Sequence, residues 1–392
     1  MNMNFNLFTS TNLLFGAGTL NELGKQNLPG KTALLLISNG KSTIENGTLD
    51  KVQKQLDKAG VEYTLCANIH ENPSKEVVME AAKTAKENSC DFILALGGGA
   101  VLDSSVAVAA MATNPGDLWD YVVGGTGKAK PLINKPLPIV TIATTSGTGS
   151  EINCWGVISN KETNEKIGFG GVPELNPVLS IVDPTLMLTV PKKYTAYQGF
   201  DALFHNTEVM ISKGVNILSE TIALSAIENI AKYLPLAVTD GSNLEARERV
   251  AYASTMAGVT MQLTSTTAKH SMEHAMSAYH SNLPHGAGLI MISNEFYKFF
   301  IEKHACDDQF IKMAKAMGTK NADKPEDFLT ALYELQKKCG VENLKMSKYG
   351  FTIDEADTLA KNARETMGGL FLANPCEMTH EDCAEIFRKS YR

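Results

Sequence analysis

The order of apolar runs in the first half of the chain constrains the fold more than any other feature. Short apolar runs such as TALLLIS, FILALGG and LPIVTIATT alternate with amphipathic stretches such as LDKVQKQLDKAG and VVMEAAKTAKENS. This alternation is typical of strand–helix–strand units, in which helices bury both faces of a parallel sheet. We therefore expect residues 1–185 to form an α/β domain around a parallel sheet.

Beyond Pro191 the pattern changes to long stretches rich in Ala, Leu, Glu, Lys and Met. SETIALSAIENIAKYLPLAV and EARERVAYASTMAGVTMQL have apolar residues at helical spacing. The segment DPTLMLTVPKKY combines two prolines with a strand end and a helix start, which marks a boundary near residue 185. Residues 186–392 are therefore expected to form a second, all-helical domain, and a length of 392 residues accommodates both.

Composition and charge exclude several classes of protein. The net charge is −7, from 36 basic and 43 acidic residues, and no basic stripe suggests a nucleic-acid partner. No apolar stretch approaches the roughly 18–20 residues that cross a bilayer, and the start of the chain lacks a signal-peptide pattern. Seven cysteines without CxxC spacing indicate reduced thiols. We expect a cytoplasmic protein without membrane or nucleic-acid partners.

Histidines gather in two short segments of the helical half. In GFDALFHNTEVM, Asp201 and His205 are four residues apart, which places both side chains on one face of a helix. The segment KHSMEHAMSAYHSNLPHGAG contains His270, His274, His280 and His285. Imidazole and carboxylate ligands suit Fe²⁺, Zn²⁺ or similar first-row ions, and do not suit Mg²⁺ or Ca²⁺. Asp201 with His205, or His270 with His274, would alone fit a solvated helix face equally well. Together the two segments favour a metal site, but the spacing does not decide which of the histidines are its ligands.

Two loops have the composition of a phosphate-binding site. ILALGGGAVLD places three glycines between an apolar run and a helix, where backbone N–H groups can approach a pyrophosphate. IVTIATTSGTGSEIN places small hydroxyl side chains after another apolar run, and these can bond phosphate, ribose or nicotinamide. A tight turn or a polar surface turn would explain either loop alone. Their shared place after parallel strands favours a nucleotide, with contacts from Gly97, Gly98, Gly99, Thr144, Thr145 and Thr148.

The motifs together resemble one family over essentially the whole chain. They are FGAGTLNELG, ALGGGAVLD, NPGDLWDY, TTSGTGSE, VDPTL, GFDALFHNTE, SMEHAMSAYHSNLPHGAG and LANPCEMTHED. In this order they resemble the iron-containing alcohol dehydrogenases, in the subset that includes butanol-dehydrogenase-like proteins. The resemblance implies a dehydroquinate-synthase-like fold, a nucleotide-binding α/β domain, a helical metal-binding domain, an active site in the cleft between them, and a homodimer.

The resemblance also implies roles for individual residues. It implies four metal ligands, Asp201, His205, His270 and His285. His274 matches a histidine near the nicotinamide that is not a ligand, and we expect it to relay the proton of the alcohol. Asp103 and Lys166 match positions close to the cofactor. The metal is expected to be Fe²⁺, with Zn²⁺ compatible with the same ligands.

The choice of coenzyme depends on the residues after the first long apolar run, LLLISNGKS. Members that prefer NAD often have an acidic residue at the position of Asn39, and here a cation, Lys41, is close by. This combination favours NADP over NAD, because no carboxylate would repel a 2′-phosphate. We expect hydride transfer between NAD(P) and a primary alcohol or aldehyde such as butanol or butanal. The alternatives are a glycerol-type polyol dehydrogenase, a lyase related to dehydroquinate synthase, and a non-catalytic metal- and nucleotide-binding protein.

Overall fold

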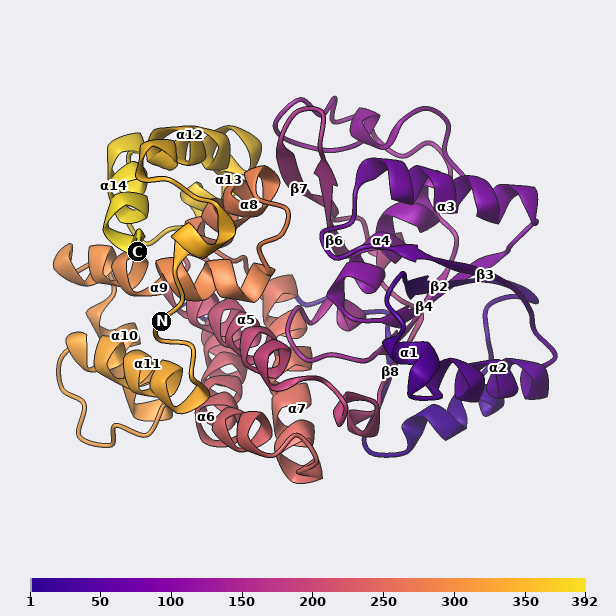
Figure 1. The fold of residues 1–392 in the computed structure, drawn as a ribbon, viewed down its shortest axis with the longest axis horizontal. Coiled ribbons are helices and arrows are strands. Elements are labelled where there is room, and N and C mark those ends of the chain that lie inside the picture. Colours follow the sequence, from indigo (N-terminus) through magenta and orange to yellow (C-terminus); the bar gives the residue numbers. More distant parts are fainter. Residues whose placement is uncertain (1) are drawn as a thin grey trace. The chain divides into compact units, whose positions relative to one another are not determined.

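The computed structural model describes residues 2–392, which divide into two compact units (Figure 1). The α/β unit comprises Phe8–Thr189, and the helical unit comprises Val190–Arg392 together with residues 2–7. The sequence instead suggested a boundary after residue 185 and assigned the first residues to the α/β unit. Residues 2–7 belong with the helical unit because Asn2 forms a parallel β-bridge with Asn216, at the start of a helix.

A six-stranded sheet forms the centre of the α/β unit. Its strands are β1 (Asn12–Phe15), β2 (Thr32–Ser38), β3 (Glu62–Ile69), β4 (Phe92–Gly97), β5 (Ile139–Ala143) and β8 (Leu179–Val182). The order across the sheet is β1-β8-β5-β4-β2-β3, and every neighbouring pair is parallel. Every residue of β4, β5 and β8 is buried, as the unbroken apolar runs predicted.

The helices that connect these strands create a switch point in the sheet. They are α1 (Ser42–Glu45), α2 (Thr48–Ala59), α3 (Lys75–Glu87) and α4 (Gly99–Met111). The chain runs outward from β2 to β3 and then returns past β2 to form β4 on its other side. Open α/β sheets bind ligands outside the carboxyl ends of the strands at such a point. Asn39 follows β2, and the three glycines run from the last residue of β4 to the first residue of α4, so both predicted cofactor segments flank the switch point.

The sequence did not predict the antiparallel hairpin that packs beside α4. It consists of β6 (Trp155–Asn160) and β7 (Glu165–Gly170). The hairpin approaches α4 closely, because a Cβ atom on Gly156 would lie 2.2 Å from the carbonyl oxygen of Asp103. Glycine at this position therefore permits backbone-to-backbone packing of the hairpin on the helix.

Residues 190–392 form helices and contribute no strand to either sheet, as predicted. The helices are α5 (Lys192–Ile211), α6 (Ile217–Thr239), α7 (Leu244–Leu263), α8 (Ala268–Tyr279), α9 (His285–Glu302), α10 (Asp307–Ala316), α11 (Glu326–Cys339), α12 (Ala356–Thr366), α13 (Gly368–Leu372) and α14 (His380–Ser390). A capping box starts α6, where Asn216 Oδ1 accepts from the Ser219 backbone and the Ser219 hydroxyl accepts from the Asn216 backbone. Within residues 2–392, no helix is both long and apolar enough to span a membrane.

The core of the helical unit holds the helices that carry the histidines. A cluster of fully buried aromatic side chains includes Phe204 on α5, Tyr297 on α9, and Phe310 and Phe328 on α10 and α11. Edge-to-face contacts join Tyr297 to Phe310 and Phe328, at ring-centroid distances of 6.0 and 5.1 Å. The rings of Phe204 and Tyr297, with centroids 6.3 Å apart, join α5 to α9 within the same cluster.

Candidate metal centre

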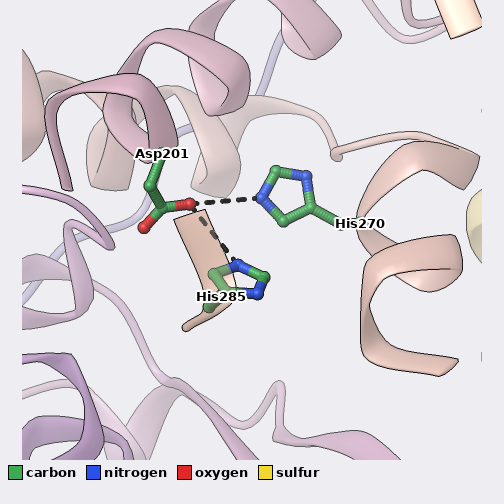
Figure 2. A group of neighbouring side chains, drawn as sticks. All are labelled: Asp201, His270 and His285. Carbon is green, nitrogen blue, oxygen red and sulfur yellow. Dashed lines mark ion pairs between the residues drawn. The ribbon is translucent and has the colours of Figure 1, made fainter. Parts of the chain in front are cut away.

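Three helices of the helical unit bring the predicted metal ligands together. Asp201 and His205 lie one turn apart on α5, His270 lies in the first turn of α8, and His285 is the first residue of α9. Helix α9 packs against both α5 and α8. Figure 2 shows the side chains of Asp201, His270 and His285 pointing toward one another.

The distances around the Asp201 carboxylate fit a shared metal ion. Asp201 Oδ1 lies 3.6 Å from His270 Nε2 and 3.5 Å from His285 Nε2. Tetrahedral coordination with bonds of about 2.0–2.2 Å separates ligand atoms by roughly 3.3–3.6 Å. One ligand-type atom from each of these three residues lies within 4.8 Å of the other two. The structure therefore brings three of the four predicted ligands into one compact group.

His205 is adjacent to this compact group and is not part of it. Its ring centroid lies 4.2 Å from that of His270. His205 Nδ1 lies 3.0 Å from the backbone carbonyl oxygen of Asp201 and 3.4 Å from Asp201 Oδ1. Donation from Nδ1–H to that carbonyl leaves the lone pair of the neutral imidazole on Nε2, which is the form that binds a metal.

Two buried atoms at the centre of the group test whether a metal ion fits. Asp201 Oδ1 and His270 Nε2 are buried, and neither has a hydrogen-bond partner among residues 2–392. Leaving one buried polar atom without a partner costs about 1–3 kcal/mol, so two such atoms facing each other are rare in a folded protein. A divalent ion with N and O ligands would satisfy both, so the residues present fit the metal that the sequence predicts.

The electrostatics of the pocket favour positive charge at the same place. Burial opposes ionisation of Asp201, but the surrounding imidazoles outweigh it and hold the pKa of this carboxyl well below its usual value. Burial likewise opposes a charge on His270, but Glu208 and Asp201 outweigh it and raise the pKa of His270. Burial lowers the pKa of His205 to about 4, so this side chain is neutral at physiological pH. The negative charges of Asp201 and Glu208 therefore favour a cation beside the Asp201 carboxylate.

His274 lies next to the metal group and contacts different atoms. Its ring centroid is 5.4 Å from that of His285 and 6.3 Å from that of His270. His274 Nδ1 lies 3.0 Å from the sulfur of Met367. Its ligand-type atoms group with those of Glu273 and His285 instead of with Asp201. His285 therefore belongs to two possible ligand groups, one with Asp201 and His270 and one with Glu273 and His274. Only the first group contains the buried atoms without a hydrogen-bond partner, Asp201 Oδ1 and His270 Nε2.

Sequence reasoning missed two carboxylates behind the histidines. Glu208 and Glu273 have no exposed side-chain surface; Glu208 Oε1 lies 2.7 Å from His270 Nδ1, and Glu273 Oε2 contacts His285 Nδ1. A signal was present, because Glu208 lies seven residues after Asp201 and Glu273 lies three residues after His270. These spacings place each glutamate on the same helical face as a predicted ligand.

In the α/β unit the two predicted phosphate-binding loops lie side by side. Strands β4 and β5 are neighbours, with Gly97 opposite Ala143 at their carboxyl ends. The backbone N–H of Thr144 donates to the carbonyl oxygen of Gly97 at 2.9 Å. Helix α4 begins at Gly99, directly after this contact. Backbone N–H groups at a helix start attract anions, so the structure supplies the element that a pyrophosphate would bind.

Glycine allows these loops to touch. A Cβ atom on Gly98 would lie 2.9 Å from Cγ2 of Thr145, and one on Gly99 would lie 2.5 Å from Cγ2 of Thr148. Both distances are too short for two carbon atoms. Close contact between backbone and threonine therefore explains the second and third glycines, independently of any ligand.

Asn39 and Lys166 are both engaged with neighbouring side chains. Asn39 is exposed just after β2, and its Nδ2 lies 2.7 Å from His70 Nδ1. Lys166 is buried on β7, and its Nζ donates to Asn72 Oδ1 at 2.9 Å. Of the two, Asn39 is the side chain that stands at the switch point of the sheet.

Asp103 supports the loops from within α4. It is buried, with Oδ1 accepting from the Ser150 hydroxyl at 2.7 Å and Oδ2 accepting from the Val157 backbone at 3.1 Å. Both carboxylate oxygens therefore bond within the protein. This arrangement ties α4 to the threonine loop and to the β6–β7 hairpin.

Comparison with known proteins identifies one family along the whole chain. Residues 10–184 match the family model for iron-containing alcohol dehydrogenase, and residues 195–391 match the model for the C-terminal domain of the same family. The chain is 31% identical to the 1,3-propanediol dehydrogenase of Klebsiella pneumoniae, with 96% of each chain covered. It is 30% identical to NADH-dependent butanol dehydrogenase A of Clostridium acetobutylicum, covering 99% of this chain and 100% of that one.

Solved structures agree with this identification. An archaeal halo-thermophilic alcohol dehydrogenase from a Red Sea brine pool matches with a TM-score of 0.93, 32% identity and full coverage of both chains. The NADH-dependent butanol dehydrogenase A of Thermotoga maritima matches with a TM-score of 0.89 and 30% identity, covering 100% of this chain and 99% of that one. The chain therefore belongs to the iron-containing alcohol dehydrogenase family and is an NAD(P)-dependent alcohol dehydrogenase.

Proposed function

We propose that this enzyme binds one Fe²⁺ and interconverts a primary alcohol and its aldehyde, with butanol and butanal as representative substrates. The proposed ligands are Asp201, His205, His270 and His285. The observation that carries the proposal is the pair of buried, unpartnered atoms Asp201 Oδ1 and His270 Nε2, with His285 Nε2 beside them. Zn²⁺ accepts the same ligands, so metal analysis of anaerobically purified protein decides between the two ions.

The ligand residues and their neighbour His274 have separate tasks. A divalent ion bound in this pocket would supply Lewis acidity, which lowers the pKa of an alcohol and polarises an aldehyde carbonyl. Asp201 supplies a negative charge, and its burial keeps water from screening that charge. His274 is almost fully buried beside His285, and we assign to it the transfer of the alcohol proton, because histidine serves as both acid and base.

The coenzyme is proposed to bind the α/β unit at the switch point. Its pyrophosphate would meet the backbone of Gly97, Gly98 and Gly99 at the start of α4, with hydroxyls from Thr144, Thr145 and Thr148. Asp103 would act by holding α4 and the Ser150 segment in place. Lys166 bonds Asn72, which follows the carboxyl end of the edge strand β3, and it would reach the coenzyme from there.

We propose NADP(H) as the preferred coenzyme. The uncharged Asn39 follows β2 and Lys41 lies two residues further on, so no carboxylate at this position repels a 2′-phosphate. The Clostridium and Thermotoga butanol dehydrogenases are named NADH-dependent, so this preference would set the present chain apart from them. The ratio of kcat/KM for NADPH and NADH measures it directly.

The named relatives support short primary alcohols and also one alternative. Similarity to a butanol dehydrogenase supports a four-carbon alcohol as the substrate of this chain. The 31% identity to a 1,3-propanediol dehydrogenase supports a diol instead. We further propose a homodimer in the cytoplasm, where the seven free cysteines would stay reduced. Light scattering on the purified protein tests the dimer.

A panel of short aldehydes, alcohols and diols tests the proposed activity. Fe²⁺-loaded protein should oxidise NADPH with butanal faster than with 3-hydroxypropanal. Faster turnover of the hydroxyaldehyde would favour the diol alternative. Absence of turnover with every substrate and both coenzymes would contradict the proposed activity.

A further inference from the structure

Two buried glutamates stand behind two of the proposed metal ligands. Glu208 Oε1 lies 2.7 Å from His270 Nδ1, and Glu273 Oε2 contacts His285 Nδ1. The opposite nitrogens of the same rings, His270 Nε2 and His285 Nε2, face Asp201 Oδ1 at 3.6 and 3.5 Å. Each imidazole therefore lies between a carboxylate on one side and the proposed metal position on the other.

This arrangement determines which nitrogen can bind a metal. A neutral imidazole has one N–H group and one lone pair, on different nitrogens. A carboxylate at Nδ1 accepts a hydrogen bond and so keeps the hydrogen there, which puts the lone pair on Nε2. It also fixes the plane of the ring and makes the lone pair more basic.

The surroundings of Glu208 hold its carboxylate in the required orientation. Oε2 accepts from both the backbone N–H and the hydroxyl of Thr267, each at 2.9 Å. Lys269 Nζ lies 3.4 Å from Oε1 and donates to the Tyr297 hydroxyl at 2.8 Å. Both glutamate and lysine are fully buried. Because Thr267 occupies Oε2, Oε1 is the oxygen that faces His270.

We propose that Glu208 is a positioning residue of the metal centre, which fixes the tautomer and orientation of His270, and that Glu273 does the same for His285. This inference rests on the proposed metal site. It assigns a role to two residues that bind neither metal nor substrate directly, and it predicts that their charge and acceptor capacity control metal affinity.

The two glutamates should respond differently to replacement by glutamine. At residue 208 both neighbours are donors, the Thr267 backbone on one side and His270 Nδ1 on the other. An amide has only one oxygen, so glutamine would turn its NH₂ group toward one of these donors. At residue 273 the Ser277 hydroxyl donates to the second carboxylate oxygen, and a hydroxyl can also accept a hydrogen bond. Glutamine at 273 can therefore keep its oxygen on His285.

Metal affinity measured on the wild type and on variants at residues 201, 208, 220 and 273 tests the proposal. Metal-free protein is titrated with Zn²⁺ against a chromophoric chelator, and circular dichroism and the melting temperature report on folding. Glu208→Gln should bind Zn²⁺ about 10- to 100-fold more weakly than the wild type. Glu208→Asp should recover part of this loss, and Glu273→Gln should lose less. Glu220→Gln is the matched control, because it removes a buried carboxylate that pairs with Lys312 in another part of the helical unit.

The outcomes separate this inference from the proposed function. If the wild type binds no ion, or Asp201→Ala binds it equally well, the proposed metal site is wrong. If the wild type binds one ion and Glu208→Gln binds it with unchanged affinity, only the positioning role is wrong. Two ions per wild-type chain would place a metal on Glu273 and His274 and would overturn the role of Glu273.

A measurement on the unmodified protein covers the case in which a variant does not fold. The ¹⁵N resonances of histidine in Zn²⁺-loaded wild type distinguish a coordinated nitrogen from one that carries hydrogen. The proposal predicts that His270 and His285 both coordinate through Nε2 and retain hydrogen on Nδ1. Coordination of either ring through Nδ1 would overturn the proposal for that ring.

Discussion

Replacement of Gly99 by alanine should damage the contact between the two phosphate-binding loops. The added methyl group would lie 2.5 Å from Cγ2 of Thr148 and 3.2 Å from its hydroxyl oxygen. Carbon atoms in contact prefer about 3.5–4.0 Å, so one loop must move by roughly an ångström. Overpacking of this kind typically costs about 1–3 kcal/mol in free energy of unfolding. Movement of the loop should also weaken coenzyme binding, since α4 starts at this residue.

A double-mutant cycle with Thr148→Ser isolates this effect. Serine removes the methyl group that causes the clash and keeps the hydroxyl oxygen that accepts from the Ser150 backbone. Thermal unfolding gives the stability of the wild type, both single variants and the double variant, and fluorescence titration with NADPH gives the dissociation constants. The Gly99→Ala variant should lose stability and coenzyme affinity, and Thr148→Ser should restore most of both.

Two outcomes would show that Gly99 and the Thr148 methyl group are not in contact. Full stability and NADPH affinity in Gly99→Ala would show that the loops are not in contact. Additive losses in the double variant would show that the damage does not pass through the Thr148 methyl group, because only residues in contact give a coupling energy.

Three further predictions concern other parts of the molecule. Asp201→Ala should abolish metal retention and turnover, whereas His274→Ala should keep one ion per chain and lower kcat; metal analysis of both variants would expose a wrong division of roles. Asn39→Asp should lower kcat/KM for NADPH more than for NADH, and an unchanged ratio would remove Asn39 from coenzyme selection. Burial opposes ionisation of Glu165, but hydrogen bonds such as that from Trp119 outweigh it and lower the pKa of this carboxyl. The pKa of this carboxyl is about 4.3 in the unfolded chain and lower in the folded protein. Ionised Glu165 therefore stabilises the fold fully above about pH 4.3, and this stabilisation is lost as the pH falls through the pKa of the folded state. Melting temperatures should show a Glu165→Gln deficit at neutral pH that narrows below about pH 4; a constant deficit would contradict the assignment.

Much of the fold was predictable because its signals are local. Apolar runs such as FILALGG became fully buried parallel strands, and the helical spacing after Pro191 became long helices. The β6–β7 hairpin was not predictable in the same way. Glu165 and Lys166 begin β7 as buried polar residues, and they are stable there because Trp119 and Asn72 from distant segments bond them. No sequence pattern within the hairpin predicts that these residues bond Trp119 and Asn72.

In the candidate metal site too, features within one helix were predictable and contacts between helices were not. Spacing alone indicated that Asp201 and His205 share a helical face, but it could not show which histidines converge on Asp201. Convergence depends on how α5, α8 and α9 pack, which brings together residues as far apart in sequence as Glu208 and His270. For the same reason the glutamates behind the histidines were found only in the structure.

Reconstitution of the metal-free protein with Fe²⁺ shows whether turnover depends on one metal ion held by Asp201. Apoprotein is prepared anaerobically, loaded with increasing Fe²⁺, and assayed at each step for bound iron and for butanal-dependent oxidation of NADPH and NADH. Activity should rise in proportion to bound iron, reach its maximum at one ion per chain, and be absent in Asp201→Ala. Activity that is independent of bound metal, or an Asp201→Ala variant that retains iron and turnover, would contradict it.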